Sequence, residues 1–320
     1  MDSLTVRPDA EAKELRGGWR DLGVVFPVQG QAPWMISHGY VPTAILQADR
    51  IRVFTAFWDS EQIGRVGYVD VAREDPSRVL GYSARPVLDL GERGAFDEHG
   101  VTPMAAVYDG EQLRLYYAGW QRSPTVRYLL FTGLAVSDDG GETFSRVSDV
   151  PVLDRSPGHF LVRTGFFAHQ DGVWKAWLAQ SEGLIEINGR PTPTYGLSYA
   201  QSDDGIVWPR QSTPCFAQGA DGVFGFGRSA IWRDASGYHA MLSVRRLSGY
   251  RIEYARSADG IAWNAPDPTG YALLPQHTAT AESETMFPSV ITADGVTYAF
   301  YNGDRFGEAG VRCARWEAIS

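Results

Sequence analysis

Three segments of the chain repeat nearly the same pattern of residues. They are residues 133–144 (GLAVSDDGGETF), 196–208 (GLSYAQSDDGIVW) and 251–263 (RIEYARSADGIAW). In each segment apolar residues alternate with small or polar ones, as in a half-buried strand, and a Ser-x-Asp turn with glycine leads to an aromatic residue. Asp accepts hydrogen bonds from turn amides and Gly adopts a positive φ, so each segment predicts a hairpin. Strand units that recur in this way indicate radially repeated sheets, which is the β-propeller architecture.

The strands expected around these turns fall into five groups. First strands are expected at residues 40–47, 101–108, 164–169, 229–233 and 287–292. Second strands are expected at 51–58, 113–120, 174–179, 238–244 and 297–302, and third strands at 64–71, 129–136, 195–201, 251–256 and 310–316. We therefore predict an all-β fold, a five-bladed β-propeller of four-stranded antiparallel blades.

The ends of the chain complete this prediction. Residues 19–28 would supply the outer strand of the last blade and close the ring, which removes an open sheet edge. Residues 1–16 are expected to form a polar leader, and residues 17–320 a single propeller domain. The 35 Gly and 18 Pro suit many turns better than long helices. A β-sandwich with a similar number of strands is the alternative.

Charge, cysteine content and hydropathy limit the possible partners. The formal net charge of −9 argues against nucleic-acid binding and against docking on acidic membranes. Cys215 and Cys313 are the only cysteines, so neither a disulfide framework nor a zinc site is expected. The N-terminus does not have the pattern of a secretion signal, and no stretch is long and apolar enough to span a membrane. We expect a cytoplasmic protein.

Polar residues occupy the end of the predicted ring where first strands begin and second strands end. At the starts of first strands lie His38, Asp97, Glu98, His99, Arg163, Arg228 and Glu284. At the ends of second strands lie Trp58, Trp120, Glu182, Arg245, Asp304 and Arg305. Unpaired buried charge costs several kcal/mol, so acids and arginines around one axis indicate a polar ligand that pairs with them. Salt bridges between blades are the alternative interpretation.

The five inner strands, the acids at their starts and the S-x-D-G-x-x-W turns that begin at Ser202 and Ser257 resemble the five-bladed glycoside hydrolases and phosphorylases. This group includes arabinanases and β-xylosidases, β-fructosidases and mannoside phosphorylases. Residues 94–120 and 300–310 resemble a bacterial branch of the same superfamily, and the resemblance covers residues 35–317. It implies a propeller that acts on glycosides. The turn at Ser137, with Asp139, Gly141, Thr143 and Phe144, also matches the sialidase Asp box, which we take as a likeness of the turn only.

One departure from the arabinanase pattern bears on the reaction. Members of that group carry an acid at the start of the first strand in blades one, two and three, whereas here His38 and Arg163 occupy the first and third of these positions. Hydrolysis by that group's three acids is therefore disfavoured. An arginine-rich funnel fits better with the mannoside phosphorylases, which use one protein acid and bind phosphate with basic side chains.

Glycosyl transfer needs a proton donor and a base or nucleophile on opposite sides of the sugar. The candidate catalytic residues are Asp97 and Glu284 as the first pair, Glu182 and Asp304 in reserve, and His38 as a proton carrier. The candidate substrate-binding residues are Arg163, Arg228, Arg245 and Arg305 for an anionic group, Trp58 and Trp120 for stacking on a pyranose, and Glu98 with His99. No cofactor is expected, and the scattered acids do not define a metal site.

We therefore predict a glycosidase-like enzyme, hydrolase or phosphorylase, that acts on a small anionic glycoside or glycoconjugate in the central funnel. Two other functions remain open. The same funnel could bind a carbohydrate or a nucleotide sugar without catalysis, or the ring could act as a scaffold for protein partners. The identity of the sugar, the stereochemistry and the oligomeric state are not defined by the sequence.

Overall fold

The computed structural model describes residues 17–216, 222–267 and 284–318, with nothing described for the side chains of Asp304 and Ala318. The expected leader, residues 1–16, lies outside the described residues. Within them the chain is almost entirely β-structure, and the one helical element is the single turn α1 (Asp304–Gly307). The predicted all-β class is therefore confirmed.

The described strands form five consecutive antiparallel meanders. The first contains β2 (Ser37–Leu46), β3 (Ile51–Trp58), β4 (Gly64–Val71) and β5 (Val79–Tyr82), and the second β6 (Val101–Asp109), β7 (Gln112–Gln121), β8 (Leu129–Ser137) and β9 (Ser145–Arg146). The third contains β10 (Val162–Gln170), β11 (Val173–Ile187), β12 (Arg190–Ser202) and β13 (Thr213–Pro214), and the fourth β15 (Ala230–Asp234), β16 (Gly237–Arg246) and β17 (Gly249–Ser257). The fifth contains β18 (Met286–Ala293), β19 (Val296–Asn302) and β20 (Gly310–Ala318).

The two ends of the chain meet in the fifth meander. Strand β1 (Gly17–Pro27) pairs antiparallel with β20, from Gly17 opposite Ala318 to Pro27 opposite Gly310. This is the pairing that the sequence predicts for residues 19–28. It covers the outer edge of the last meander, so that strand addition at that edge is prevented.

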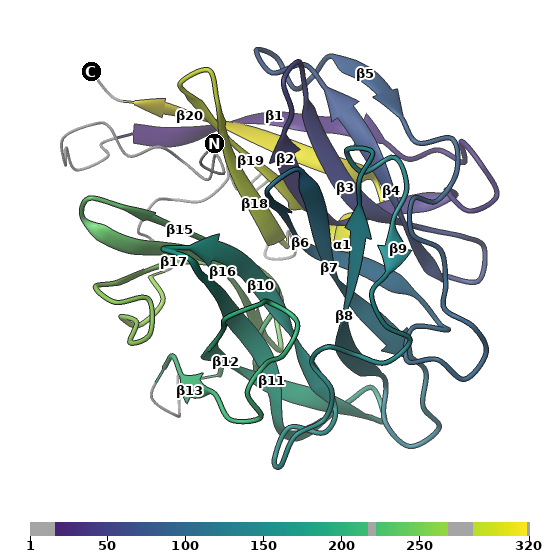
Figure 1. Cartoon of the computed structure of the whole chain (residues 1–320), viewed down its shortest axis with the longest axis vertical. Coiled ribbons are helices and arrows are strands. Elements are labelled where there is room, and N and C mark those ends of the chain that lie inside the picture. The colour runs from purple at the N-terminus through teal and green to yellow at the C-terminus, as the bar shows by residue number, and fades with distance from the viewer. Residues whose placement is uncertain (1–16, 217–221, 268–283, 319–320) are drawn as a thin grey trace.

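The first strand of each meander lies toward the middle of the molecule and the later strands lie outward (Figure 1). Strand β2 packs beside β6 and β18, and β6 packs beside β10. Short parallel pairings connect neighbouring meanders: Leu130 in β8 faces Val162 in β10, and Tyr195 in β12 faces Gly225 in β14 (Gly225–Phe226). The starts of the inner strands are thereby brought to one end of the molecule.

Most of the hydrophobic core lies between consecutive meanders. One cluster joins the first meander to the second through Phe54 and Tyr117, and the next joins the second to the third through Tyr116 and Phe167, whose rings stack at 4.1 Å. Further clusters join the third meander to the fourth and the fourth to the fifth. A last one joins the fifth to the first, with Phe300 beside Phe57. Because burial of apolar surface is the main stabilising term, each meander depends on both of its neighbours.

The three repeated turns are built in the same way. In the second one, Asp204 accepts hydrogen bonds from the amides of Ile206 and Val207, and Trp208 donates its indole N–H to the Gly205 carbonyl. That carbonyl also accepts from the Tyr116 hydroxyl of the preceding meander. The turn therefore closes its own hairpin and attaches it to a neighbour, which is a structural role and explains its recurrence in the sequence.

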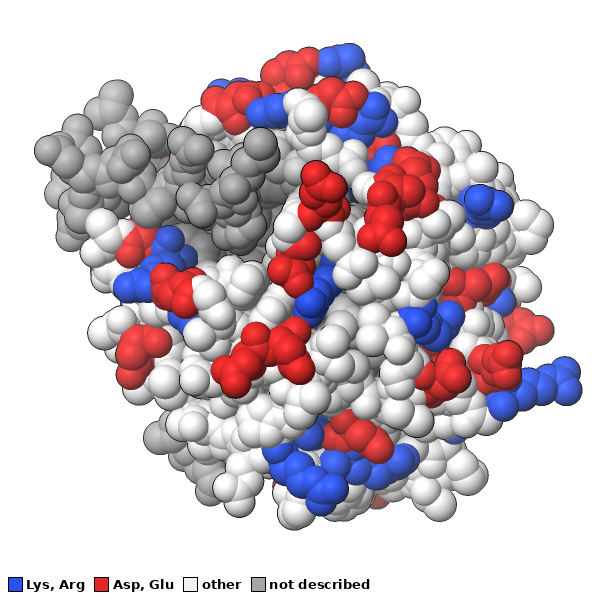
Figure 2. Space-filling model, in the orientation of Figure 1, with Lys and Arg blue, Asp and Glu red and all other residues white. Residues whose placement is uncertain are grey.

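The surface carries both signs of charge. On the face seen in Figure 2, acidic side chains are spread over much of the surface with basic ones between them. Within the described residues, no helix has the length and apolar character needed to cross a membrane.

We expect Asp139→Ala to lower the free energy of unfolding by about 1 kcal/mol at neutral pH, because Glu142 and Thr143 lose the carboxylate that accepts from their amides. Burial by itself would raise the pKa of the Asp139 carboxyl, but hydrogen bonds from Ser137 and Thr143 outweigh this effect. The pKa of Asp139 therefore falls to about 2 in the folded chain, from 3.8 in the unfolded chain. The stabilisation is thus complete above pH 3.8 and is lost as the pH falls through 2.

Urea unfolding of the wild type and the variant at several pH values measures this difference. Asp138→Ala is the matched control, since its carboxylate accepts from the Gln112 side chain, in an exposed hydrogen bond, rather than from turn amides. A stability difference that stays constant down to low pH would show that the Asp139 carboxylate is not responsible.

Candidate functional site

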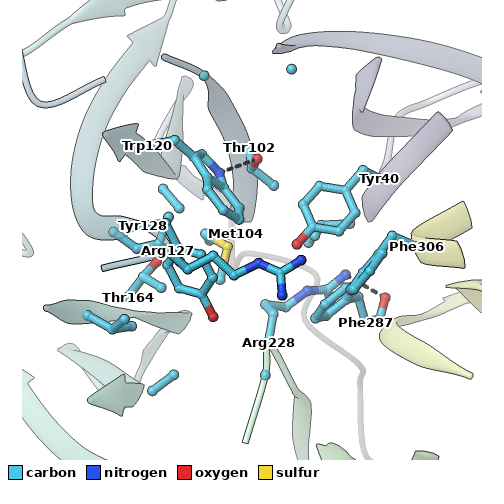
Figure 3. A pocket seen from close by; sticks show the side chains of 18 of the residues that line it. Tyr40, Thr102, Met104, Trp120, Arg127, Tyr128, Thr164, Arg228, Phe287 and Phe306 are labelled. Carbon is cyan, nitrogen blue, oxygen red and sulfur yellow. Dashed lines mark hydrogen bonds between the residues drawn. The ribbon is translucent and has the colours of Figure 1, made fainter. Parts of the chain in front are cut away.

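A pocket of about 370 Å³ lies at the end of the molecule where the inner strands begin (Figure 3). Its floor contains one residue near the start of each inner strand. These residues are Val41, Thr102, Thr164, Arg228 and Phe287. We refer to these five as the floor ring. The site is therefore assembled from all five meanders, as the sequence predicts for a funnel at this end.

Three floor-ring residues are each followed by a proline: Val41, Thr102 and Phe287. The strand pairing shifts register at each of these places. Proline has no amide hydrogen to donate to a ladder, so it is tolerated at such a bulge. Val41 and Phe287 each have a positive φ of 54°. This backbone conformation is strained for residues with side chains of this size. Two of the five floor-ring residues thus have a strained backbone conformation.

The Arg228 side chain holds the bulged strands together. Its guanidinium donates to the carbonyls of Pro42, Phe287 and Pro288, the second at 2.8 Å. The residue is 2% exposed, and its Nε has no hydrogen-bond partner among the described residues. Burial lowers the pKa of Arg228 to about 9, so the side chain still carries a positive charge at neutral pH.

A second arginine lies among tyrosines on the pocket wall. Arg245 donates to the hydroxyls of Tyr195 at 3.0 Å and Tyr128 at 3.2 Å, and Tyr195 is hydrogen-bonded to Tyr250. Burial raises the pKa of each of these three phenols, which keeps them protonated. Burial opposes the charge on Arg245, but the phenol oxygens raise its pKa overall. The wall therefore offers one cation and neutral hydroxyl groups to a ligand.

Aromatic rings form much of the remaining wall. Trp58 lines the pocket and stacks on His38 at 3.8 Å, and Trp120 donates its indole N–H to the Thr102 hydroxyl at 2.9 Å. Figure 3 shows the rings of Trp120, Tyr40 and Phe306 along one side of the pocket. Such rings suit the apolar face of a pyranose.

The outer part of the pocket contains arginines supplied by a loop and a hairpin. Strands β11 and β12 continue past the body of the sheet, from Gly183 opposite Thr194 to Ile187 opposite Arg190. Arg190 at this end and Arg127 in the loop before β8 both line the pocket, and the Arg127 amide donates to the Pro191 carbonyl at 2.9 Å. The Arg127 side chain points into the pocket (Figure 3). The loop and the hairpin are thus fixed to each other at the opening.

The lining has a single sign of charge. Among the described lining residues, Arg122, Arg127, Arg190, Arg228 and Arg245 are basic, and none is Asp or Glu. This contrasts with the formal net charge of −9 for the whole chain. A pocket of this kind attracts anions.

The predicted acid Asp97 does not line this pocket among the described residues. Asp97 is 1% exposed, its Oδ2 lies 2.8 Å from the Arg146 guanidinium, and the Tyr117 hydroxyl donates to the same oxygen at 3.0 Å. Its Oδ1 has no hydrogen-bond partner among the described residues. Asp97 and Arg146 belong to the same meander, so this ion pair is not the salt bridge between blades that the sequence offered as the alternative.

The other candidate acids are also outside the described pocket lining. Glu284 accepts from the Tyr250 amide at 2.9 Å, directly behind a tyrosine of the pocket wall. Glu182 is exposed at the bulge in β11. The side chain of Asp304 lies outside the described residues. Among the described residues, no group of His, Cys, Asp and Glu has an arrangement suited to a metal ion.

Of the remaining predicted residues, some line the pocket and the others form contacts outside it. Arg228, Arg245, Trp58, Trp120 and His99 line the pocket. Arg163 is buried, donates to the Gln180 side chain and to the carbonyls of Asp154 and Pro209, and has a pKa lowered by burial. Arg305 is exposed and pairs with Glu308 at 2.8 Å, and Glu98 accepts from the Gly94 amide. His38 is buried behind Trp58, where burial lowers the pKa of its imidazole.

Sequence reasoning missed several lining residues, and for some a signal was present. The segment from Glu182 to Thr194 has alternating apolar residues around Asn188-Gly189, the strongest short signal for a hairpin, and both turn residues have positive φ. It therefore predicts the extension that carries Arg190. No comparable signal marks Tyr128 or Arg127, which lie in a loop whose path depends on that hairpin.

Comparisons with known proteins place this site on a familiar fold. No family model matches the chain. Two curated relatives, Uncharacterized protein MT1551 and Uncharacterized protein Rv1502, from Mycobacterium tuberculosis strains CDC 1551 / Oshkosh and ATCC 25618 / H37Rv, are each 29% identical over 297 residues. The alignment covers 91% of this chain and 97% of each relative.

Similar solved structures include proteins described as glycoside hydrolases. A glycosyl hydrolase from Bacteroides ovatus is 14% identical with a TM-score of 0.68 over 98% of this chain and 96% of its own. A second structure, described as a glycoside hydrolase, is 16% identical with a TM-score of 0.68 over 96% and 94%. A structure of the GH130 family of mannoside phosphorylases, described as containing glycoside hydrolases that target β-1,2 mannosidic linkages, is 11% identical with a TM-score of 0.65 over 98% and 97%. At these identities the similarity shows a shared fold.

We expect Asp97→Asn to lower the free energy of unfolding by roughly 3 kcal/mol, because Arg146 loses its buried carboxylate partner. In the double variant with Arg146→Gln, the loss should be smaller than the sum of the two single losses by about 1 kcal/mol or more. Urea unfolding measures all three variants, and Arg155→Gln, at an exposed arginine, serves as the control. Strictly additive losses would contradict the ion-pair role.

Proposed function

We propose that the chain is a glycoside-active enzyme whose pocket binds a small glycoside through an anionic group. The observation that carries this proposal is the charge of the site, with arginines and aromatic rings but no carboxylate among the described lining residues. Glycoside hydrolases and a mannoside phosphorylase family share the fold, which supports action on a glycosidic bond.

The physical argument rests on the cost of buried charge. A cation partly removed from water without a counter-charge is unfavourable, and Arg245 is half-buried with neutral phenols as its hydrogen-bond partners. A carboxylate or phosphate group on the sugar would offset this cost, because guanidinium binds either group with two parallel hydrogen bonds. Trp58 and Trp120 would then face the rings of the same ligand.

Proton transfer to the leaving oxygen is assigned to His99. Among the described lining residues, His99 is the one side chain whose ring nitrogens can both accept and donate a proton without a guanidinium or a buried phenol having to lose one. His99 Nδ1 lies 3.6 Å from Glu98 Oε1, so the carboxylate can stabilise the imidazolium. In this proposal the sequence-predicted pair, Asp97 and Glu284, supports the pocket through Arg146 and the Tyr250 amide.

The attacking oxygen distinguishes two reactions. In hydrolysis water attacks the anomeric carbon, and in phosphorolysis inorganic phosphate does so, while the proton moves to the departing oxygen in both cases. An arginine-lined pocket favours phosphate, because water would need a carboxylate base that the described lining does not supply. The second candidate function is binding of an anionic carbohydrate or nucleotide sugar without catalysis. The lack of a carboxylate base among the described lining residues favours this function as well.

We also propose that the five meanders are the blades of a closed five-bladed propeller. The hydrophobic clusters support this arrangement, since they join each meander to the next and the fifth to the first. In the fourth blade, the isolated bridge between Tyr254 and Asp267 would take the place of a fourth strand. A cytoplasmic location is part of the same proposal.

Replacement of Arg245 by Gln tests the anion-binding part. We expect the variant to bind glucuronate about 10- to 100-fold more weakly, because a charge-assisted hydrogen bond is lost. Its affinity for glucose should not change, and titration calorimetry measures both affinities. Arg20→Gln removes the same charge from the exposed outer strand β1 and is the control. Equal affinities of the wild type for glucuronate and glucose would contradict the proposal.

His99→Gln separates catalysis from binding. With aryl uronides and aryl glycosides as substrates, in the presence and absence of inorganic phosphate, we expect the variant to bind ligand as the wild type does and to lose most of its turnover. Wild-type protein that binds glucuronate but leaves every glycoside of the panel intact would support the binding function instead.

A further inference from the structure

The arginines that line the pocket differ from many arginines of the framework. Arg52 lies 2.8 Å from Asp70, and Arg146 lies 2.8 Å from Asp97, both outside the described lining. Among the described residues, no lining arginine forms an ion pair. Acidic side chains outnumber basic ones in this chain, 38 to 29. The positive charge of the pocket is therefore left without carboxylate partners although such partners are plentiful elsewhere.

The pleat of the β11–β12 hairpin directs a cation to the pocket and an acid away from it. Ile187 lies opposite Arg190 in the ladder, and Glu186 lies opposite Pro191. Side chains opposite each other share one face of a ribbon, and successive side chains alternate between its faces. Arg190 lines the pocket, whereas Glu186 is exposed and belongs to the other face. The charge of Arg190 is thus not compensated by the acid of its own hairpin.

Arg127 brings a second cation to the same opening. Its amide donates to the Pro191 carbonyl at 2.9 Å, so its backbone lies beside the residue that follows Arg190. Both side chains line the pocket, and that of Arg127 points into it (Figure 3). Both are exposed, and within the described part of the chain neither side chain has a hydrogen-bond or ion-pair partner. We refer to Arg127 and Arg190 as the outer arginine pair.

The outer arginine pair and Arg245 lie along one wall of the pocket. Tyr128 follows Arg127 in the chain, and its hydroxyl accepts from Arg245 at 3.2 Å. One dipeptide therefore connects the outer cation with the cation that is proposed to bind the acidic group of the sugar. Because all of these side chains line a single pocket of about 370 Å³, one small ligand can reach both places.

We propose that the substrate is an acidic oligosaccharide, with one anionic sugar at Arg245 and a second one at the outer arginine pair. This inference rests on the proposed function and names its substrate class. The second anionic group is a carboxylate or a sulfate ester, since guanidinium donates two parallel hydrogen bonds to an oxyanion of this kind. The loop and the hairpin are already fixed to each other, so little ordering is required when this group binds.

Titration calorimetry compares ligands that have one anionic group with ligands that have two. The first set is galacturonate, mannuronate and an unsulfated chondroitin disaccharide. The second set is digalacturonate, dimannuronate and the sulfated chondroitin disaccharide, and galactose with galactobiose is the neutral pair. We expect the wild type to bind at least one two-anion ligand about 3- to 10-fold more tightly than its one-anion counterpart. The neutral pair should show no such increase.

The double variant Arg127→Gln with Arg190→Gln tests the outer site. Both side chains are exposed and the backbone hydrogen bond to Pro191 is retained, so the fold should not change. We expect the ratio of two-anion to one-anion affinity to fall to about one, and a general loss of attraction for anions cancels in this ratio. Arg20→Gln with Arg78→Gln removes two charges from exposed positions outside the described lining and should keep the wild-type ratio.

Each outcome has a defined meaning. An increase for the uronate dimers alone assigns the second group to a carboxylate, and an increase for the sulfated disaccharide alone assigns it to a sulfate ester. A wild-type ratio near one for every two-anion ligand, an equal increase for the neutral pair, or a ratio that the double variant leaves unchanged contradicts the outer site. The dependence of one-anion ligands on Arg245 would stand in that case. A wild type that binds no acidic sugar better than galactose would instead contradict the proposed function itself.

Discussion

The cross-link made by Arg228 at the centre of the molecule supports both the fold and the pocket. Three inner strands change register beside a proline, and this leaves backbone carbonyls of β2 and β18 without ladder partners. A buried guanidinium with several donors in one plane satisfies Pro42, Phe287 and Pro288 together. The strained residues Val41 and Phe287 are held by these contacts. A positive charge at the axis is therefore a consequence of how the inner strands are joined.

This charge gives the site a chemistry that the fold alone does not specify. Structures of glycoside hydrolases and of a mannoside phosphorylase family share the architecture, and the described lining here has arginines and protonated phenols but no carboxylate. Buried arginines are retained where an anion compensates them, since water is a poor substitute in an enclosed space. The proposed ligand, its anionic group and the role of His99 all follow from this one property of the pocket.

Strand positions followed from local patterns, whereas residue roles depended on neighbours that the sequence does not reveal. Strand β4 has the predicted bounds, and β1 pairs as expected, because alternation and turn residues act over short distances. Asp97 and Arg163 lie near the starts of β6 and β10, but Arg146 pairs with one carboxylate oxygen of Asp97, and Arg163 donates to the carbonyls of Asp154 and Pro209. Arg146 and Pro209 are 49 and 46 residues away from the side chains that they contact, so no local pattern could have indicated them.

The sequence by itself determined the all-β class, the order of the strands and the hairpin turns. These features depend on the alternation of side chains and on the conformations open to Asp, Gly and Pro. Only the tertiary structure decided which charged groups face the pocket and which pair within the framework. A side chain with a neutralising partner is removed from the site, whereas Arg228 and Arg245 stay available because their partners are uncharged carbonyls and phenols.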